Sequence, residues 1–460
     1  MCGSECKAKS LGWPTALLVN VFAAFCMRAW LGLAWGGWGL SFMTGSYQSA
    51  RSTLAKTWHV RGLTRQAKRL KSKDCDIPET YIEDSEGIEG LYFNQKSLLA
   101  EHLFANEGIP ALRRWSKWYK APWWLQQGDL MTMLAGSLRE VAKLDAPQKL
   151  SVQTLGGEMP LDLFSDPSPT KSKAVILIPG LGGSTEGGYV KNMAESLIHS
   201  GFVVAGLNLG SALQRPRSAS AHRGSSDDLR AVAKYIRQNL LSESPSADRK
   251  VFAIGWSLGG NILVNTLAEQ KTKEGYAHDN FSLIDGGVAL CTTHCLSRCA
   301  TQWEQHWPMR NVYDPHVLRN LKRLLEPAIP FYQQGPVRSW NGTDTLIDHK
   351  MLKFATRIRD VDEALIRRMF GYKSVEDYYY QASSCRRLAE VEVPLLMVSA
   401  ADDPMATSWA PFKTVRGSKH VILAYTKHGG HIGWQDESNA RKSEWVEDVA
   451  TSFLNRLLTF

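Results

Sequence analysis

The sequence predicts an α/β fold in which helices cover both faces of a doubly wound, mostly parallel sheet. From about residue 150 onward, strand-like and helix-like runs alternate along the chain. Residues 174–178 (AVILI) are apolar throughout, as expected for a strand buried on both faces, and residues 189–200 form an amphipathic pattern that ends at Gly201. The turn GWSLGG at 255–260 then joins a short apolar run to a helix-like stretch. These observations predict repeated strand–helix units.

The remaining elements continue this alternation. A helix is expected at 226–241, where Ser226 and two aspartates supply the capping oxygen and the negative charge that a helix N-terminus favours. A closing helix is expected at 443–458. Further strands are expected at 202–209, 251–254, 286–291, 394–400 and 419–425.

The stretch between Cys291 and Pro394 lacks strand alternation, is rich in aromatic residues and has a mainly helical pattern. We interpret it as a helical cap inserted into the sheet. The predicted organisation is a hydrophobic membrane anchor or targeting segment at 1–44, a basic helical linker region at 45–114, the first part of the core at 115–291, the cap at 292–390 and the second part of the core at 391–460.

The N-terminal region combines an apolar segment with a basic one. Residues 11–43 carry Arg28 as their only charge, and about 20 apolar residues suffice to span a bilayer. The net charge of +9 arises from eight Lys and Arg within 51–73, because the remaining 46 nearly balance 45 acids. A basic stretch beside an apolar one favours a membrane surface over nucleic acid. We expect a membrane-associated protein of an endomembrane or organelle, with a cleaved organellar targeting peptide as the alternative.

The turn at 255–260 has the features that a nucleophilic serine needs. A short buried strand precedes Ser257, Gly255 and Gly259 leave room for close backbone contact, and a helix starts at once. The N-terminus of that helix points its positive end at the hydroxyl. Ser257 is therefore a candidate nucleophile, and an ordinary turn between a strand and a helix is the alternative.

A serine nucleophile needs a base and an acid, which in this kind of fold follow in the order serine, acid, histidine. Asp402 and Asp403 follow the strand expected at 394–400, and His428 and His431 follow the one at 419–425. We choose Asp403 because it immediately precedes a turn-making proline. We choose His431 because the two glycines before it let the loop swing the imidazole over Ser257. A polar turn residue and a surface histidine are the alternatives.

Backbone amides can supply the oxyanion site. The strand at 174–178 leads into the glycine-rich run PGLGGS at 179–184, which lacks the G-K-[ST] of a phosphate-binding loop. We expect the amides of Leu181 and Leu258 to stabilise the oxyanion. The candidate substrate-binding residues are Trp256, Trp303 and Trp307.

The cysteine pattern favours neither a disulfide framework nor a metal site. The eight cysteines are thinly spread over a long chain. Cys291, Cys295 and Cys299 flank His294, but their spacing is not a C-x-x-C pair and no second pair follows. We therefore predict no metal and no cofactor.

Several motifs resemble those of the α/β-hydrolases, in particular the branch known as AB hydrolase family 4, which contains mammalian membrane-anchored lipid hydrolases and yeast medium-chain ester synthases. They are PGLGGS, GWSLGGN, RDVDEALIRRMFGYKSVEDYYYQASS, AADDP and GGHIGW, and the resemblance covers about residues 115–460. The segment KAPWWLQQGDLMTML is also similar, although Asp129 stands where a histidine is expected. The resemblance implies a nucleophile, acid and base at Ser257, Asp403 and His431, and an N-terminal membrane anchor.

The resemblance implies a membrane-associated serine hydrolase. We expect it to cleave acyl esters of lipids, such as phospholipids or monoacylglycerols, through an acyl-enzyme on Ser257. An acyltransferase that passes the acyl group to an alcohol is one alternative. A lipid-binding receptor or scaffold without catalytic activity is another.

Overall fold

The computed structural model describes residues 89–104, 109, 112, 118–154, 157–165, 171–208, 226–245, 248–270, 283–339, 343–407, 409–437, 441 and 444–460. All of them belong to the second of two compact units, Tyr81–Phe460. The predicted anchor at 11–43 and basic stretch at 51–73 lie outside the described residues. Within the described ranges, no helix is both long enough and apolar enough to cross a bilayer.

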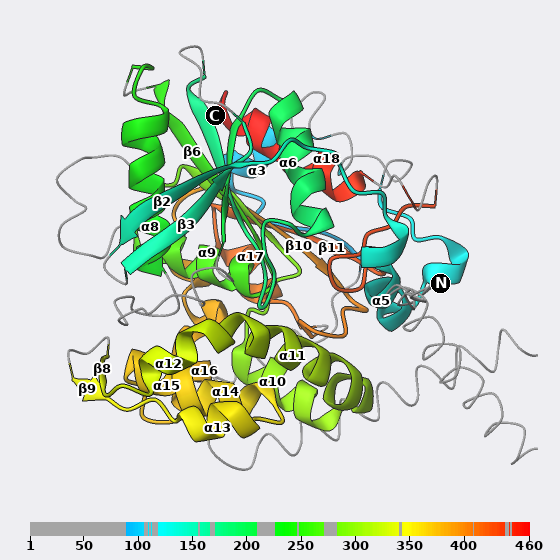
Figure 1. The fold of residues 1–460 in the computed structure, drawn as a ribbon. Coiled ribbons are helices and arrows are strands. Elements are labelled where there is room, and N and C mark those ends of the chain that lie inside the picture. The colour runs from blue at the N-terminus through cyan, green and yellow to red at the C-terminus, as the bar shows by residue number, and fades with distance from the viewer. Residues whose placement is uncertain are drawn as a thin grey trace, which may run out of the picture. The chain divides into compact units, whose positions relative to one another are not determined.

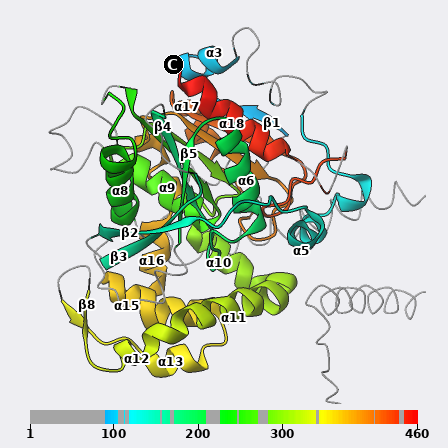
Figure 2. The same ribbon diagram turned by 45° about the horizontal axis from the view of Figure 1, so that its top comes forward.

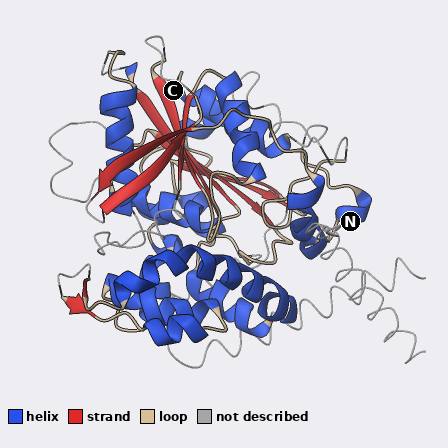
Figure 3. Ribbon diagram, viewed as in Figure 1, coloured by secondary structure: helices blue, strands red, loops and turns tan. Residues whose placement is uncertain are grey.

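A nine-stranded sheet forms the centre of this unit (Figures 1 and 3), with strand order β1-β11-β10-β7-β6-β4-β5-β3-β2. The six strands from β11 to β5 are parallel, and β1 and β3 are antiparallel to their inner neighbours. The predicted mostly parallel sheet is thus confirmed. The strands are β1 (Gly90–Tyr92), β2 (Gln148–Thr154), β3 (Gly157–Leu163), β4 (Lys173–Ile178), β5 (Val203–Leu207), β6 (Lys250–Trp256), β7 (Gly286–Leu290), β10 (Leu395–Ala400) and β11 (Val421–Thr426).

Helices cover both faces of the sheet because its inner strands carry apolar side chains on both sides. Val175 and Val204 face the core cluster that includes α6 and α18, whereas Ile176 and Val203 face the cluster that includes α8, α9 and α17. The two helical layers lie on opposite sides of the sheet (Figure 2). The helices around the sheet are α3 (Leu98–Phe104), α5 (Gly128–Leu138), α6 (Gly188–His199), α8 (Ser226–Tyr235), α9 (Leu258–Glu269), α17 (Phe412–Gly417) and α18 (Trp445–Leu457), with short η2 (Trp123–Leu125) and the π-helix η3 (Ile236–Leu240).

A separate layer of helices, the cap, lies between β7 and β10 in the sequence (Figure 1) and encloses its own apolar cluster. A short hairpin of β8 (Val337–Arg338) and β9 (Asp344–Thr345) interrupts the helices. The cap helices are α10 (Leu296–Gln305), η5 (Met309–Tyr313), α11 (Asp314–Leu325), η6 (Glu326–Ala328), α12 (Ile329–Tyr332), α13 (His349–Phe354), α14 (Ile358–Val361), η7 (Asp362–Ile366), α15 (Arg367–Phe370), α16 (Val375–Ala382), η8 (Ser384–Arg386) and η9 (Leu388–Glu390).

Strand β1 extends the sheet beyond the range predicted for the core. It falls inside the stretch 45–114, which the sequence analysis interprets as a linker, and Leu91 pairs with Ala424 of β11. A strand of three residues is too short to produce a recognisable period. The domain boundaries remain predictions.

The parallel register brings several strand ends together. Ile178 of β4 lies opposite Gly255, and Trp256 at the end of β6 lies opposite Leu290. The loops that follow β4, β6, β7, β10 and β11 therefore leave the same edge of the sheet, where sites of doubly wound folds occur.

Candidate active site

The backbone at Ser257 is strained, as in a nucleophile turn. Ser257 lies between β6 and α9 with φ of 53° and ψ of −118°, and its amide donates to the Leu290 carbonyl over 2.9 Å. A Cβ at Gly255 would lie 2.4 Å from the Gly259 carbonyl oxygen, and one at Gly259 would lie 2.1 Å from the Ile178 oxygen. Only glycine allows this approach, so both glycines of the motif are explained by packing.

Asp403 and His431 form a buried pair at the ends of β10 and β11. The Nδ1 atom of His431 lies 2.9 Å and 3.1 Å from the two carboxylate oxygens of Asp403. The amides of Met405 and Ala406 donate to Asp403 Oδ1 over 2.8 Å and 2.9 Å, which fixes the carboxylate within its own turn. Because Nδ1 faces the acid, Nε2 is the imidazole nitrogen that faces away from it.

The neighbouring candidates form a second pair. His428 Nδ1 lies 3.2 Å from Asp402 Oδ2, and the Gly430 amide donates to Asp402 Oδ1 over 2.9 Å. This pair is more exposed, with side chains about 20% accessible against 5% or less for Asp403 and His431. Through these two contacts Asp402 stabilises the loop that carries His431.

Helix α5 packs against both loops. Thr132 Oγ1 accepts a hydrogen bond from the His431 amide over 2.8 Å and donates to the Gly128 carbonyl over 2.7 Å. A Cβ at Gly128 would lie only 1.6 Å from the Asp402 carbonyl oxygen. Sequence reasoning noted only Asp129 in this helix, and the structure places Asp129 against Tyr313 of the cap, whose hydroxyl donates to its carboxylate over 3.2 Å.

One face of α10 holds the acid loop, residues 401–407 after β10. Gln302 Nε2 donates to the Pro404 carbonyl over 2.8 Å and Trp303 Nε1 donates to Met405 over 3.0 Å. One helical turn earlier, the thiol of Cys299 donates to the Ala406 carbonyl over 3.5 Å. Three successive carbonyls are thus satisfied by positions i, i+3 and i+4 of one helix. The indole N–H of Trp303, a predicted substrate contact, is thus hydrogen-bonded to the acid loop.

The buried thiol of Cys291, the residue after β7, lies near the turn at Ser257 and near the loop of residues 427–437 after β11, the histidine loop, which carries His431. Burial raises its pKa well above the usual range, and the charge of Asp403 acts in the same direction. The nearby backbone amides of Ser257 and Ile432 favour the thiolate and oppose that rise in pKa. A single side chain therefore lies near the backbone of both the candidate nucleophile and the residue after the candidate base.

The glycine-rich loop after β4 lies against the serine. A Cβ at Gly180 would lie 3.1 Å from Ser257 Cβ and 3.7 Å from Ser257 Oγ. The buried hydroxyl of Tyr189 on α6 lies against the same loop, because a Cβ at Gly183 would lie 2.7 Å from it. The amides of Leu181 and Leu258 as oxyanion donors remain a prediction that this placement favours.

The other two candidate substrate residues lie in different surroundings. Trp256 is buried at 2% exposure and packs edge-on against Tyr189, with ring centroids 5.1 Å apart. Trp307 is 68% exposed on the cap. The buried Trp256 side chain packs in the core directly before Ser257 and so stabilises the turn at Ser257. Contact of either ring with substrate remains a prediction.

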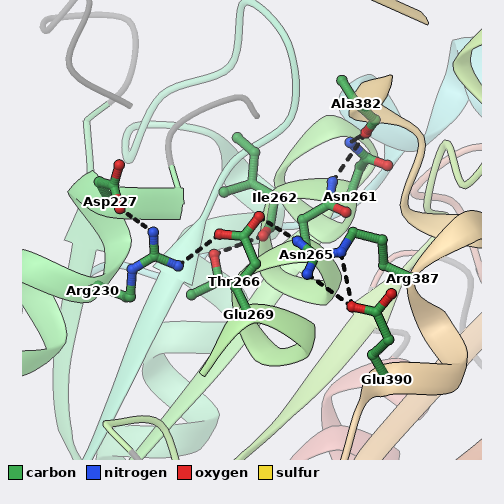
Figure 4. A network of polar contacts seen from close by, with 10 residues as sticks. All are labelled: Asp227, Arg230, Asn261, Ile262, Asn265, Thr266, Glu269, Ala382, Arg387 and Glu390. Carbon is green, nitrogen blue, oxygen red and sulfur yellow. Dashed lines mark hydrogen bonds and ion pairs between the residues drawn. The ribbon is translucent and has the colours of Figure 1, made fainter. Parts of the chain in front are cut away.

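A buried polar network ties α9, which begins at the candidate nucleophile, to the segment that leaves the cap (Figure 4). The carboxylate of Glu269, at the end of α9, forms ion pairs with Arg230 of α8, over 2.8 Å, and with Arg387. Asn261 and Asn265 both donate to the Ala382 carbonyl, over 2.8 Å and 3.0 Å. The network joins α8, α9 and the segment 382–390, which are far apart in the sequence, and sequence reasoning identified none of the contacts between them.

The cysteine and histidine motif does not converge on a metal-binding arrangement. Over the described ranges, no group of three or more His, Cys, Asp and Glu side chains could hold a metal ion. Burial lowers the pKa of His294 to about 3, and its Nδ1 lies 3.3 Å from Ser384 Oγ. His294 is therefore a neutral core residue.

Comparison with known proteins gives a matching family model and several similar sequences. The sequence model of the alpha/beta hydrolase fold family matches residues 173–432. The chain is 29% identical over 300 residues to the embryogenesis-associated protein EMB8 of Picea glauca, covering 64% of this chain and 61% of that protein. It is 26% identical to the phospholipase ABHD3 of Homo sapiens, covering 73% of this chain and 78% of the relative. It is 24% identical to the monoacylglycerol lipase ABHD2 of Danio rerio, covering 72% and 78%.

Proposed function

Because the chain belongs to the alpha/beta hydrolase fold family, we propose that it is a serine hydrolase that cleaves acyl esters of lipids. The observation that carries this proposal is the buried Asp403–His431 pair at the sheet edge where Ser257 sits in a strained turn. Two relatives are named as a phospholipase and a monoacylglycerol lipase, which supports a lipid ester as substrate. Membrane association would come from residues 11–43 and the basic stretch 51–73.

In the proposed mechanism, Ser257 Oγ attacks the acyl carbon while His431 Nε2 takes its proton. Asp403 holds the imidazole through Nδ1 and stabilises the imidazolium that forms. The amides of Leu181 and Leu258 bind the oxyanion of the tetrahedral intermediate. The imidazolium then protonates the leaving alcohol, and a water molecule activated by His431 hydrolyses the acyl-enzyme.

The two neighbouring aspartates offer a matched test. Asp403→Asn should leave the fold intact but lower kcat for a medium-chain p-nitrophenyl ester by roughly 10³- to 10⁴-fold, because the imidazole loses its orienting carboxylate. Asp402→Asn should lower it far less, because Asp402 pairs with His428 and not with His431. Equal losses in both variants, or a larger loss in Asp402→Asn, would contradict the proposed assignment. Detergent-solubilised full-length protein is used throughout.

A further inference from the structure

Cys295 and Cys385 lie 90 positions apart in the sequence, yet their side chains are in contact. Both are buried free thiols, and each shifts the pKa of the other. The ring of Trp409 completes the cluster, and the guanidinium of Arg298 lies 5.1 Å from its centroid. Neither thiol takes part in the proposed hydrolysis.

The backbone holds the two cysteines side by side. The Cys385 amide donates to the carbonyl of His294, the residue before Cys295, over 3.0 Å. The amide of Leu296, the residue after Cys295, donates to Ser383 Oγ over 2.9 Å. These two hydrogen bonds join the segments on either side of the pair, and a disulfide needs two cysteines whose Cα atoms lie about 4.4–6.8 Å apart.

The two thiols have complementary chemical characters. Cys295 is the N-cap residue of α10, and its pKa is lowered to about 7, first by the adjacent Cys385 thiol and then, against the effect of burial, by the nearby Arg298 and Ser297 amides and the Arg298 charge. The pKa of Cys385 is raised by the adjacent Cys295 thiol and by burial. Cys295 is thus the more acidic thiol of the pair and the one that ionises first.

We propose that Cys295 and Cys385 are a reversible redox site that closes to a disulfide on reaction with hydrogen peroxide. The Cys295 thiolate attacks a peroxide oxygen, which gives a sulfenic acid and a hydroxide that takes up a proton to become water. The Cys385 sulfur then displaces the hydroxyl group, which leaves as a second water with the Cys385 proton. Two thiols and one peroxide give one disulfide and two waters, and a dithiol reductant reverses the reaction.

The position of the pair gives the disulfide a structural consequence. Cys295 lies where the chain passes from β7 into the cap, and Cys385 lies where it leaves the cap for β10. The crosslink would close a loop that contains the cap from α10 to α16, which restricts the unfolded chain. It would also tether the start of α10, the helix that holds the acid loop.

Peptide mapping separates this pair from the other cysteines. Trypsin cleaves after Lys273, Arg298, Lys373 and Arg386, so Cys295 and Cys299 fall on different peptides and Cys385 on a third. The full-length protein is reduced, desalted, treated with hydrogen peroxide, alkylated and digested. We expect a mass about 2 Da lower than the sum of peptides 274–298 and 374–386, fragments that place the bond at Cys295, and its loss on dithiothreitol treatment.

Three variants complete the test. Cys295→Ser and Cys385→Ser should each abolish the crosslink, whereas Cys299→Ala should retain it. Peroxide should raise the midpoint of thermal unfolding of the wild type but not of Cys385→Ser. A peroxide-treated wild type without the 274–298/374–386 crosslink, or with a bond to Cys291 or Cys299 in its place, would overturn the proposal. Because mass and unfolding are measured, failure here is separate from failure of the proposed hydrolase activity.

Discussion

Replacing Gly128 with alanine tests whether α5 fixes the acid loop. An alanine Cβ would lie 1.6 Å from the Asp402 carbonyl oxygen and 2.7 Å from its carbonyl carbon. Ordinary contact begins at 3.4 Å, so the two backbones must separate by 3.4 − 1.6 = 1.8 Å along this contact. The opposing atoms are backbone, which no side-chain rotation can move aside. Asp403, the next residue, must move with Asp402.

The expected effect on activity follows from that displacement. A misplacement of about 1 Å at a catalytic group can cost roughly 10²-fold in rate, so Gly128→Ala should lower kcat for a p-nitrophenyl ester by at least about 10²-fold. Overpacking of this kind should also lower the free energy of unfolding by about 1–3 kcal/mol. Initial rates and denaturant unfolding of the same preparation give both values.

Gly417 supplies the matched control for this substitution. A Cβ at Gly417, the last residue of α17, would have no heavy atom within 4 Å. Gly417→Ala should therefore keep wild-type kcat and leave stability unchanged or slightly higher. If Gly128→Ala showed kcat within twofold of Gly417→Ala and unfolded at the same denaturant concentration, the inferred support of the acid loop by α5 would be refuted.

Three further substitutions test separate parts of the structure. Burial raises the pKa of Asp362 from 3.8 to about 7, so the folded state keeps a proton that the unfolded state releases. The free energy of unfolding should therefore fall by about 4 kcal/mol as the pH rises from about 4 to 7. Asp362→Asn should remove most of this fall, as measured by denaturant unfolding across that pH range, and an unchanged pH profile would contradict the assignment. Trp303→Phe should lower kcat about tenfold with KM unchanged, because it removes the hydrogen bond from Trp303 to the acid loop. A rise in KM alone would instead support the prediction that Trp303 contacts the substrate. Glu269→Gln leaves two buried arginines undercompensated and should lower the free energy of unfolding by about 3–5 kcal/mol, whereas a loss below 1 kcal/mol would show the network to be dispensable.

The strands that build the site could be predicted because their apolar runs are continuous. The run at 174–178 becomes β4 at Lys173–Ile178, and the run at 394–400 becomes β10 at Leu395–Ala400. Local chemistry also identified the turn at Ser257, whose glycines are required by contacts within that turn and with the adjacent strand. Such features depend on residues close in sequence or on one strand pair.

Features that depend on distant residues could not be predicted. The support of the acid loop by α10 joins Trp303 to Met405, and the support of the histidine loop by α5 joins Thr132 to His431, across stretches that give no periodic signal. The burial of Trp256 in the core, by contrast, could have been predicted. Side chains of a strand alternate, so Trp256 shares the face of Ile254, and both belong to the core cluster on the α6 side.

The account depends most on Ser257 being an activated nucleophile. The most direct measurement is labelling of detergent-solubilised full-length protein with a fluorophosphonate probe, compared with Ser257→Ala and with Ser226→Ala, a buried serine at the start of α8. The account predicts one probe per chain on wild type and on Ser226→Ala, and none on Ser257→Ala. Folded wild-type protein that takes up no probe, or Ser257→Ala that labels as fast as wild type, would contradict it.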